Sequence, residues 1–321
     1  MAGLVDTYGW EIEAYAPVHR EEWDAFALAA RNSVFLFRRG YMDYHSDRFR
    51  DRSLMARRRG RLLALLPANL TDDGVLHSHS GLTYGGWILP EKHLDAEDVL
   101  SLFHAAAAYC RNHGIKAVDY KPLPWIYARR PSQEDLYALY RLGATPSGAQ
   151  VSSTIDYRDP GTFNTLMRRH LRKADALGPV IGETGDVPAF HRLLEECLRE
   201  RHAVAPVHSL AELTLLRDRF PQNIRLFTAS LDGEPQAGVC MYLTDTVAHA
   251  QYIATTPCGR KLNLLTPLFH HLIELYSATH RYFDFGTSNE EGGLVLNAGL
   301  LRQKSSYGAT ATIYSRYLLT L

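Results

Sequence analysis

The chain has 321 residues, of which 46% are hydrophobic and 22% charged, and its 35 basic and 35 acidic side chains give a formal net charge of zero. This length exceeds one ordinary hydrophobic core, so we expect two domains, and the composition excludes a disordered protein. The balanced charge argues against a strongly basic nucleic-acid binder.

Residues 1–15 lack the basic segment and apolar core of a signal peptide, and no run approaches about 18 apolar residues. We therefore expect a cytoplasmic protein without a membrane span. The four cysteines lie far apart with no CxxC pair, so neither a zinc site nor a disulfide framework is indicated, and no metal is predicted.

The first half is predicted to form helices, then strands, and then alternating helices and strands. Acidic residues follow Asp95 and Gly114 lies near the end of the segment, which predicts a helix over 95–114. Ser132 is the expected N-cap of the next helix. The expected helices are 20–31, about 34–43, 95–114 and 132–143, and the expected strands are 52–57, 61–67, 75–89, 115–121 and 149–157.

A connecting helix is expected within 158–178, and the second half then repeats the order of the first. The Asp-Gly pair at 232–233 lies between two apolar runs and predicts a hairpin turn. The expected helices are 187–202, 209–219, 262–277 and 294–306, and the expected strands are 223–231, 235–243, 246–255, 281–286 and 309–319.

Two sequence landmarks recur at one offset. Val118-Asp119-Tyr120 resembles Phe283-Asp284-Phe285, Gly143-Ala144-Thr145 matches Gly308-Ala309-Thr310, and both 284 − 119 and 308 − 143 equal 165. The repeat predicts an α/β (α+β) protein with two similar domains, 1–157 and 158–321, each a mixed, mostly antiparallel sheet flanked by helices. The alternative is two unrelated units that share a helix-then-strand order.

The order of elements in the second half resembles the GNAT acyltransferase superfamily. In that fold the strand at 246–255 splays from the strand at 281–286, the thioester arm of acyl-CoA lies in the gap, and its diphosphate rests on the loop and helix start that follow. A helix N-terminus offers free N–H groups to a diphosphate. The resemblance implies donor binding by Thr255, Gly259, Arg260, Lys261 and Asn263, although the usual loop has two glycines and this one has only Gly259.

The last helix carries a second resemblance. Many GNAT enzymes have an Asn there, a Tyr seven residues on and a Gly eleven residues on, whereas here Asn297 is followed by Lys304 and Gly308. A Lys before an aromatic-Gly pair resembles the Fem-type aminoacyltransferases, tandem GNAT folds that attach amino acids from aminoacyl-tRNA to peptidoglycan precursors. Related tandem proteins occur in surface-polysaccharide pathways. The chain lacks the long helical arm of the Fem family, so tRNA is not favoured as a partner.

The Fem-type resemblance implies a catalytic Lys304 before Tyr307-Gly308, and the polar strand end that begins at Asp284 adds Asp284 and Glu290 as candidate catalytic residues. A fixed cation at Lys304 stabilises the negative charge that acyl transfer builds on the carbonyl oxygen. Either Glu290 or Glu291, on a loop at a strand end, is expected to accept a proton from the attacking ammonium. The alternatives are a solvated helix lysine at 304 and a turn-bonding aspartate at 284.

The first half has no equivalent donor loop, so we expect it to shape the acceptor pocket. Segments rich in aromatic rings and in side chains that end in hydrogen-bonding groups are typical of sites that bind sugars or peptides. The candidate acceptor-binding residues are Tyr44, His45, Arg48, Tyr84 and Trp125.

The resulting hypothesis is an acyltransferase that moves an acyl or aminoacyl group from a CoA thioester or aminoacyl-tRNA to an amine on a cell-envelope sugar or peptide precursor. The alternative is a non-catalytic GNAT-like protein that binds a ligand or partner. The sequence does not set the oligomeric state.

Overall fold

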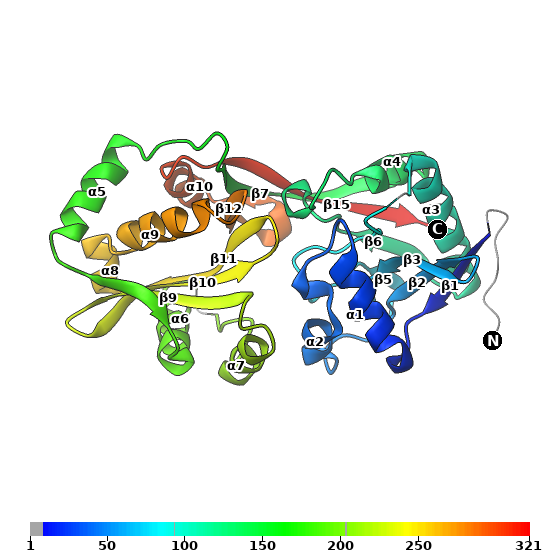
Figure 1. Cartoon of the computed structure of the whole chain (residues 1–321), viewed down its shortest axis with the longest axis horizontal. Helices are drawn as coiled ribbons and strands as arrows, with labels where there is room; N and C mark the ends of the chain where they lie inside the picture. Colours follow the sequence, from blue (N-terminus) through cyan, green and yellow to red (C-terminus); the bar gives the residue numbers. More distant parts are fainter. Residues whose placement is uncertain (1–8, 93, 203) are drawn as a thin grey trace. The chain divides into compact units, whose positions relative to one another are not determined.

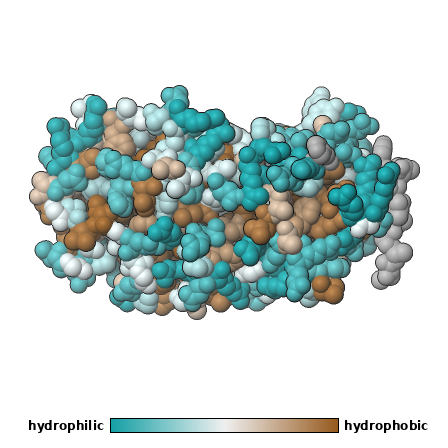
Figure 2. All heavy atoms as spheres, in the orientation of Figure 1, coloured by the Kyte–Doolittle hydropathy of each residue, from teal (hydrophilic) through white to brown (hydrophobic). Residues whose placement is uncertain are grey.

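The computed structural model describes residues 9–92, 94–202 and 204–321. The prediction about a signal peptide falls partly on residues 1–8, which lie outside the described residues. Within the described ranges no helix is both long and apolar enough to cross a membrane. Polar residues cover much of the face drawn in Figure 2.

The chain divides into two compact units. The first comprises residues 1–150, 291–294 and 313–321, and the second comprises residues 151–290 and 295–312. The expected boundary between 157 and 158 lies a short way beyond this division. Each half of the sequence also contributes its last strand to the other unit, because β7 (Thr145–Asp156) runs into the second unit and β15 (Thr310–Thr320) ends in the first.

The first unit contains an antiparallel three-stranded sheet, β1-β2-β3, and a second group in the order β4-β5-β6-β15. β5 and β6 are parallel, and β15 is antiparallel to β6. The elements are β1 (Trp10–Ala14), α1 (Arg20–Ala29), α2 (Arg39–Met42), β2 (Leu54–Arg58), β3 (Arg61–Leu66), β4 (Asn69–Leu70), β5 (Val75–His77), α3 (Ala96–Asn112), β6 (Ala117–Tyr120) and α4 (Glu134–Arg141), with short 3-10 helices η1 (Pro17–His19), η2 (Phe35–Phe37), η3 (Asp43–His45) and η4 (Trp125–Tyr127).

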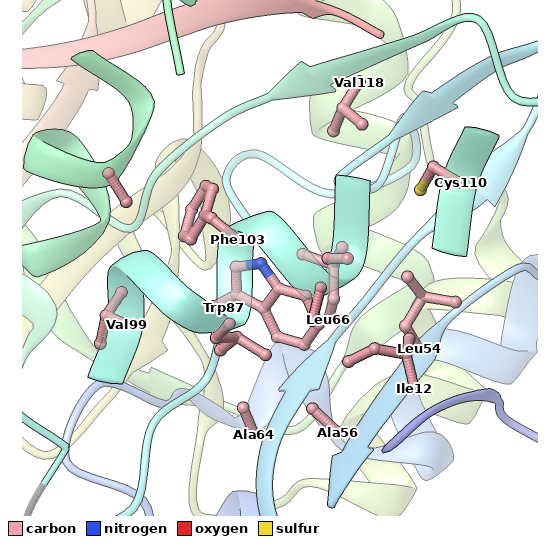
Figure 3. Close-up of a cluster of buried hydrophobic side chains, with 14 of the residues drawn as sticks. Ile12, Leu54, Ala56, Ala64, Leu66, Trp87, Val99, Phe103, Cys110 and Val118 are labelled. Carbon is pink, nitrogen blue, oxygen red and sulfur yellow. The ribbon is translucent and has the colours of Figure 1, made fainter. Parts of the chain in front are cut away.

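The core of this unit forms where α3 packs against the small sheet (Figure 3). The Asp95 carboxylate accepts hydrogen bonds from the Glu97 and Asp98 amides, both at 2.9 Å, which satisfies two orphan N–H groups of the first turn. Trp10, which is fully buried, donates from its indole to the Ser101 hydroxyl at 2.8 Å. The strand that carries Trp10 was not predicted from the sequence.

Two local predictions in this unit are wrong. The expected strand 75–89 ends at His77, because the chain then folds back on itself around glycines. A Cβ on Gly85 would lie 1.9 Å from the Ser78 carbonyl oxygen, and Gly86 has a φ of +85°. Ser132 is not the N-cap of α4, since that position is Gln133, and the Ser132 hydroxyl accepts from Arg31 Nε at 3.0 Å.

The second unit contains a sheet in the order β7-β12-β11-β10-β9-β8, in which only β11 and β12 are parallel. The Asp232-Gly233 turn joins β9 to β10, as predicted, with a φ of +51° and +83°. The elements are α5 (Thr165–Asp175), β8 (Val180–Thr184), α6 (Val187–His202), α7 (Leu210–Arg219), β9 (Ile224–Leu231), β10 (Glu234–Leu243), β11 (Val247–Thr255), α8 (Pro257–Leu262), α9 (Leu265–Ser277), β12 (Tyr282–Thr287), β13 (Asn289–Glu290), η5 (Glu291–Gly293, in the first unit), β14 (Val295–Leu296) and α10 (Ala298–Ser305).

Helices cover both faces of this sheet, with α9 on one side and α6 on the other (Figure 1). The alternation of β10 explains the arrangement: Ala237, Val239 and Met241 belong to the core cluster that includes α9, whereas Gly238 faces Phe190 of α6. The two-sided burial leaves the ends of the central strands as the places where polar side chains can gather.

Candidate active site

The central parallel strands of the second unit stop pairing before either strand ends. Their register joins Val247 to Tyr282, Ala248 to Phe283 and His249 to Asp284, yet β11 continues to Thr255 and β12 to Thr287. The strands therefore part after the His249–Asp284 pair.

Asp284 lies at this point and is fully buried. Its neighbours Phe283 and Phe285 belong to the α9 core, and strand alternation turns the carboxylate to the other face. The carboxylate accepts from Ser152 Oγ at 2.5 Å and Thr154 Oγ1 at 2.9 Å, and His249 Nδ1 lies 2.7 Å from its other oxygen. The alternative of a turn-bonding aspartate is thus wrong.

Lys304 reaches the same strand end from α10, whose N-cap, Asn297, accepts from the Leu300 amide at 2.9 Å. The Lys304 ammonium donates to the carbonyl oxygens of Gly286 at 2.8 Å and Thr287 at 2.7 Å. The side chain is only 4% exposed, which excludes a solvated helix lysine. An ammonium has three donors, and within the described residues the third N–H has no partner.

Burial lowers the pKa of Lys304 to about 8, and the nearby Asp284 carboxylate partly offsets that effect. The unfolded chain has a lysine pKa of about 10.4, so between these two values the unfolded state binds more protons. The stability of the wild type relative to Lys304→Met is therefore expected to be lowest below pH 8 and to rise as the pH approaches 10.4. Urea unfolding of both proteins across this range measures the difference, and a difference independent of pH would contradict it.

The other two candidate catalytic residues have different surroundings. Tyr307 is buried in the core, where its ring stacks on Phe285 with centroids 5.4 Å apart, and burial raises its pKa. Glu290 is exposed and accepts from Asn297 Nδ2 at 2.7 Å. The structure thus brings Lys304 and Asp284 together around Gly286, gives Tyr307 a packing role and holds Glu290 at the surface.

The candidate donor loop forms the short helix α8. Thr256 caps it by accepting from the Gly259 amide at 2.9 Å, so the protein itself uses that N–H. Gly259 is required by the neighbouring strand, because a Cβ there would lie 2.1 Å from the Gln236 carbonyl oxygen of β10.

The remaining donor candidates are spread around α8. Thr255 is buried, Lys261 is exposed, and Arg260 donates to the Thr255 carbonyl at 3.0 Å and pairs with Glu200. Asn263 does not start the following helix: it ends α8 in the left-handed conformation, with a φ of +60°. Their role in donor binding stays a prediction.

The packing of Gly259 predicts a loss of stability that is independent of any donor. Gly259→Val is expected to lower the free energy of unfolding by about 1–3 kcal/mol, because the side chain forces α8 away from β10. Urea unfolding measures the change. Gly182→Val on β8 is the matched control, since a Cβ at Gly182 meets no atom within 4 Å. Equal stability of the two variants would contradict the packing argument.

The acceptor candidates form two groups in the first unit. The His45 ring is almost fully buried and stacks on His79, with centroids 5.2 Å apart, while the half-buried ring of Tyr44 lies under Arg48. Tyr84 is buried in a second group of rings that includes Tyr127 and Tyr314. Trp125, at 48% exposure, and Arg48 are the two exposed residues among the five candidates.

Sequence reasoning missed the partners of Asp284. His249, Ser152 and Thr154 come from β11 and β7, and nothing in their local sequence marks them as a set. In the described part of the chain, no group of three or more His, Cys, Asp or Glu side chains is arranged to hold a metal ion.

Comparisons with known proteins bear on the fold and the class of protein. Residues 163–291 match the model of the Acetyltransferase (GNAT) domain, a range that includes His249 and Asp284. The comparison with curated protein sequences gives no match. The matched domain makes the chain an acyltransferase.

Solved structures with low sequence identity share the fold. FemX is 12% identical, with a TM-score of 0.68 and 97% of each chain covered. A tandem GNAT protein from the clavulanic acid biosynthesis pathway is 13% identical, with a TM-score of 0.51 and coverage of 97% of this chain and 98% of that one. L-PGS from Bacillus licheniformis is 13% identical, with a TM-score of 0.54 and coverage of 80% and 81%. The predicted fold class, two tandem GNAT-like domains that resemble the Fem type, is confirmed.

Proposed function

We propose that this protein transfers an acyl or aminoacyl group, from a CoA thioester or an aminoacyl-tRNA, to an amine on a sugar or peptide precursor of the cell envelope. The observation that carries the proposal is the buried Lys304 ammonium at the end of β12, where β11 and β12 part. The similarity to FemX and L-PGS supports aminoacyl donors, and the GNAT domain supports CoA thioesters.

Lys304 suits the stabilisation of a developing oxyanion. Two of its N–H groups are fixed by the Gly286 and Thr287 carbonyls, so the ammonium is oriented before a substrate arrives. The third N–H can then donate to the carbonyl oxygen of the donor as negative charge builds on it. Such a preorganised donor stabilises the transition state more than the bound substrate.

The test is a panel of donors against a panel of amines. Acetyl-CoA, longer acyl-CoA thioesters and alanyl-tRNA are incubated with glucosamine, a UDP-linked amino sugar or a lysine-containing peptide, and mass spectrometry detects the N-acylated product. Donor binding is measured separately by thermal shift, because a ligand at 100 times its Kd stabilises the fold by about 2.7 kcal/mol. Product from any donor–acceptor pair supports acyl transfer, and the amine that reacts identifies the chemical class of the acceptor. Binding without product from any pair would favour a ligand-binding protein instead.

A further inference from the structure

Each unit carries a histidine–aspartate pair at the same place in its sheet. His77 on β5 lies opposite Asp119 on β6, and His249 on β11 lies opposite Asp284 on β12, in both cases as the last paired residues of the only parallel ladder in the unit's described strands. In both pairs the imidazole Nδ1 is 2.7 Å from the carboxylate. The equivalence of the two aspartates in the parallel registers therefore extends to their histidine partners, although the two histidines do not share the offset of 165.

The His77–Asp119 pair of the first unit forms hydrogen bonds with further partners. Arg316 of β15 forms two hydrogen bonds of 2.6 Å with the two oxygens of Asp119, which neutralises the carboxylate. The other ring nitrogen of His77, Nε2, lies 3.2 Å from the Thr71 hydroxyl. Both ring nitrogens and both carboxylate oxygens are thus engaged, and this pair serves the structure of the sheet.

The pair in the second unit has different neighbours. Asp284 accepts from the hydroxyls of Ser152 and Thr154 with one oxygen, where Asp119 is bound by a guanidinium, and its other oxygen lies 2.7 Å from the imidazole Nδ1 of His249. An Nδ1–H that donates to Asp284 places the lone pair of the neutral ring on Nε2. The side chain of His249 is 11% exposed, while that of Asp284 is fully covered.

His249 and Lys304 meet at the same residue. The Gly286 carbonyl accepts from Lys304 Nζ, and a Cβ built on Gly286 would lie 3.4 Å from His249 Cε1 and 4.0 Å from Nε2. Gly286 has a φ of +76°, which a side chain rarely allows. A glycine at position 286 keeps the space beside the imidazole free of a side chain. That space lies within reach of the Lys304 ammonium, the group proposed to stabilise the oxyanion.

We propose that His249 is the general base of the second unit and that Asp284 is its positioning residue, an inference that rests on the proposed function. Nε2 takes a proton from the attacking ammonium of the acceptor, and the nitrogen then forms the C–N bond to the donor carbonyl. The bond from that carbon to the leaving sulfur or oxygen breaks with its electron pair on the leaving atom. The leaving atom takes one of the two protons left on the nitrogen, the amide product keeps the other, and the imidazolium releases its own to solvent.

The test compares matched substitutions in the two pairs, with a donor and acceptor that give product with the wild type. His249→Asn keeps an N–H for Asp284 and removes the base, so kcat is expected to fall about 10²- to 10⁴-fold with KM little changed. Added imidazole should restore part of the rate, and the deficit should be smaller with hydroxylamine, which is uncharged at neutral pH. His77→Asn, the control in the first unit, should leave kcat unchanged.

Asp284→Asn tests whether Asp284 positions the His249 imidazole or only contributes to packing. It should lower kcat at an unchanged KM, and imidazole should not restore the rate, because the wild-type ring still fills the site. His249→Gln repeats the test if circular dichroism shows that His249→Asn does not fold. Full kcat in a folded His249 variant, or an equal loss in His77→Asn, would overturn the proposal while leaving acyl transfer established. A wild type inactive with every donor would instead overturn the proposed function, and this inference with it.

Discussion

Lys304→Met is expected to lower kcat about a hundredfold, because a preorganised donor to a developing oxyanion contributes roughly 3 kcal/mol to the transition state. Met keeps the length of the side chain and removes the charge and all three N–H groups. KM should change little, since the lost interaction belongs to the transition state. Steady-state kinetics with the active donor and acceptor measure both constants.

A matched lysine on the same unit provides the control for this substitution. Lys261 is exposed, and Lys261→Met removes the same charge without reaching β12. It should retain full kcat, with any change confined to KM for the donor. Lys304→Met with wild-type kcat in a folded protein would mean that the ammonium only ties α10 to the Gly286 and Thr287 carbonyls.

Asp284→Ala is expected to lower the free energy of unfolding by about 3–5 kcal/mol, the range found when one partner of a buried charged pair is removed. The substitution leaves Ser152, Thr154 and His249, all of which are buried, without their shared acceptor. It also removes the charge that offsets the burial of Lys304. Urea unfolding measures the loss.

Asp284→Asn is the control, because its amide keeps one acceptor oxygen at nearly the same volume. We expect it to destabilise the protein clearly less than Asp284→Ala does. A loss below about 1 kcal/mol for Asp284→Ala would contradict the view that this carboxylate organises the strand end, because each buried unsatisfied donor alone costs about that much.

Local patterns predicted most of the helices and strands well. Asp95 starts α3 and the Asp232-Gly233 turn joins β9 to β10, because capping and turn chemistry act within a few residues. The predictions failed where tertiary packing decides the local structure. The strand expected at 75–89 ends at His77, because Gly85 and Gly86 allow a close approach of the chain that a side chain would block. The segment expected as a loop before the helix at 262–277 forms the six-residue helix α8, which ends at Asn263.

The site was predictable only in part for a related reason. Asp284 and Lys304 were found because each belongs to a short motif near a landmark of the repeat or the family. His249 was missed because 249 − 77 is 172, so an offset of 165 does not align the two histidines, and only the parallel register of the folded strands pairs each with its aspartate. Ser152 and Thr154 come from the other half of the sequence, through a strand exchange that no local pattern encodes.

A crystal structure with a donor analogue tests the central claim most directly. The analogue is the active CoA thioester with a methylene group inserted between the carbonyl carbon and the sulfur, or the matching stable aminoacyl-nucleotide if the donor proves to be tRNA. We expect the analogue to lie where β11 and β12 part, with its carbonyl oxygen about 2.7–3.2 Å from Lys304 Nζ. An analogue bound elsewhere, or a carbonyl beyond about 4 Å from this ammonium, would contradict it.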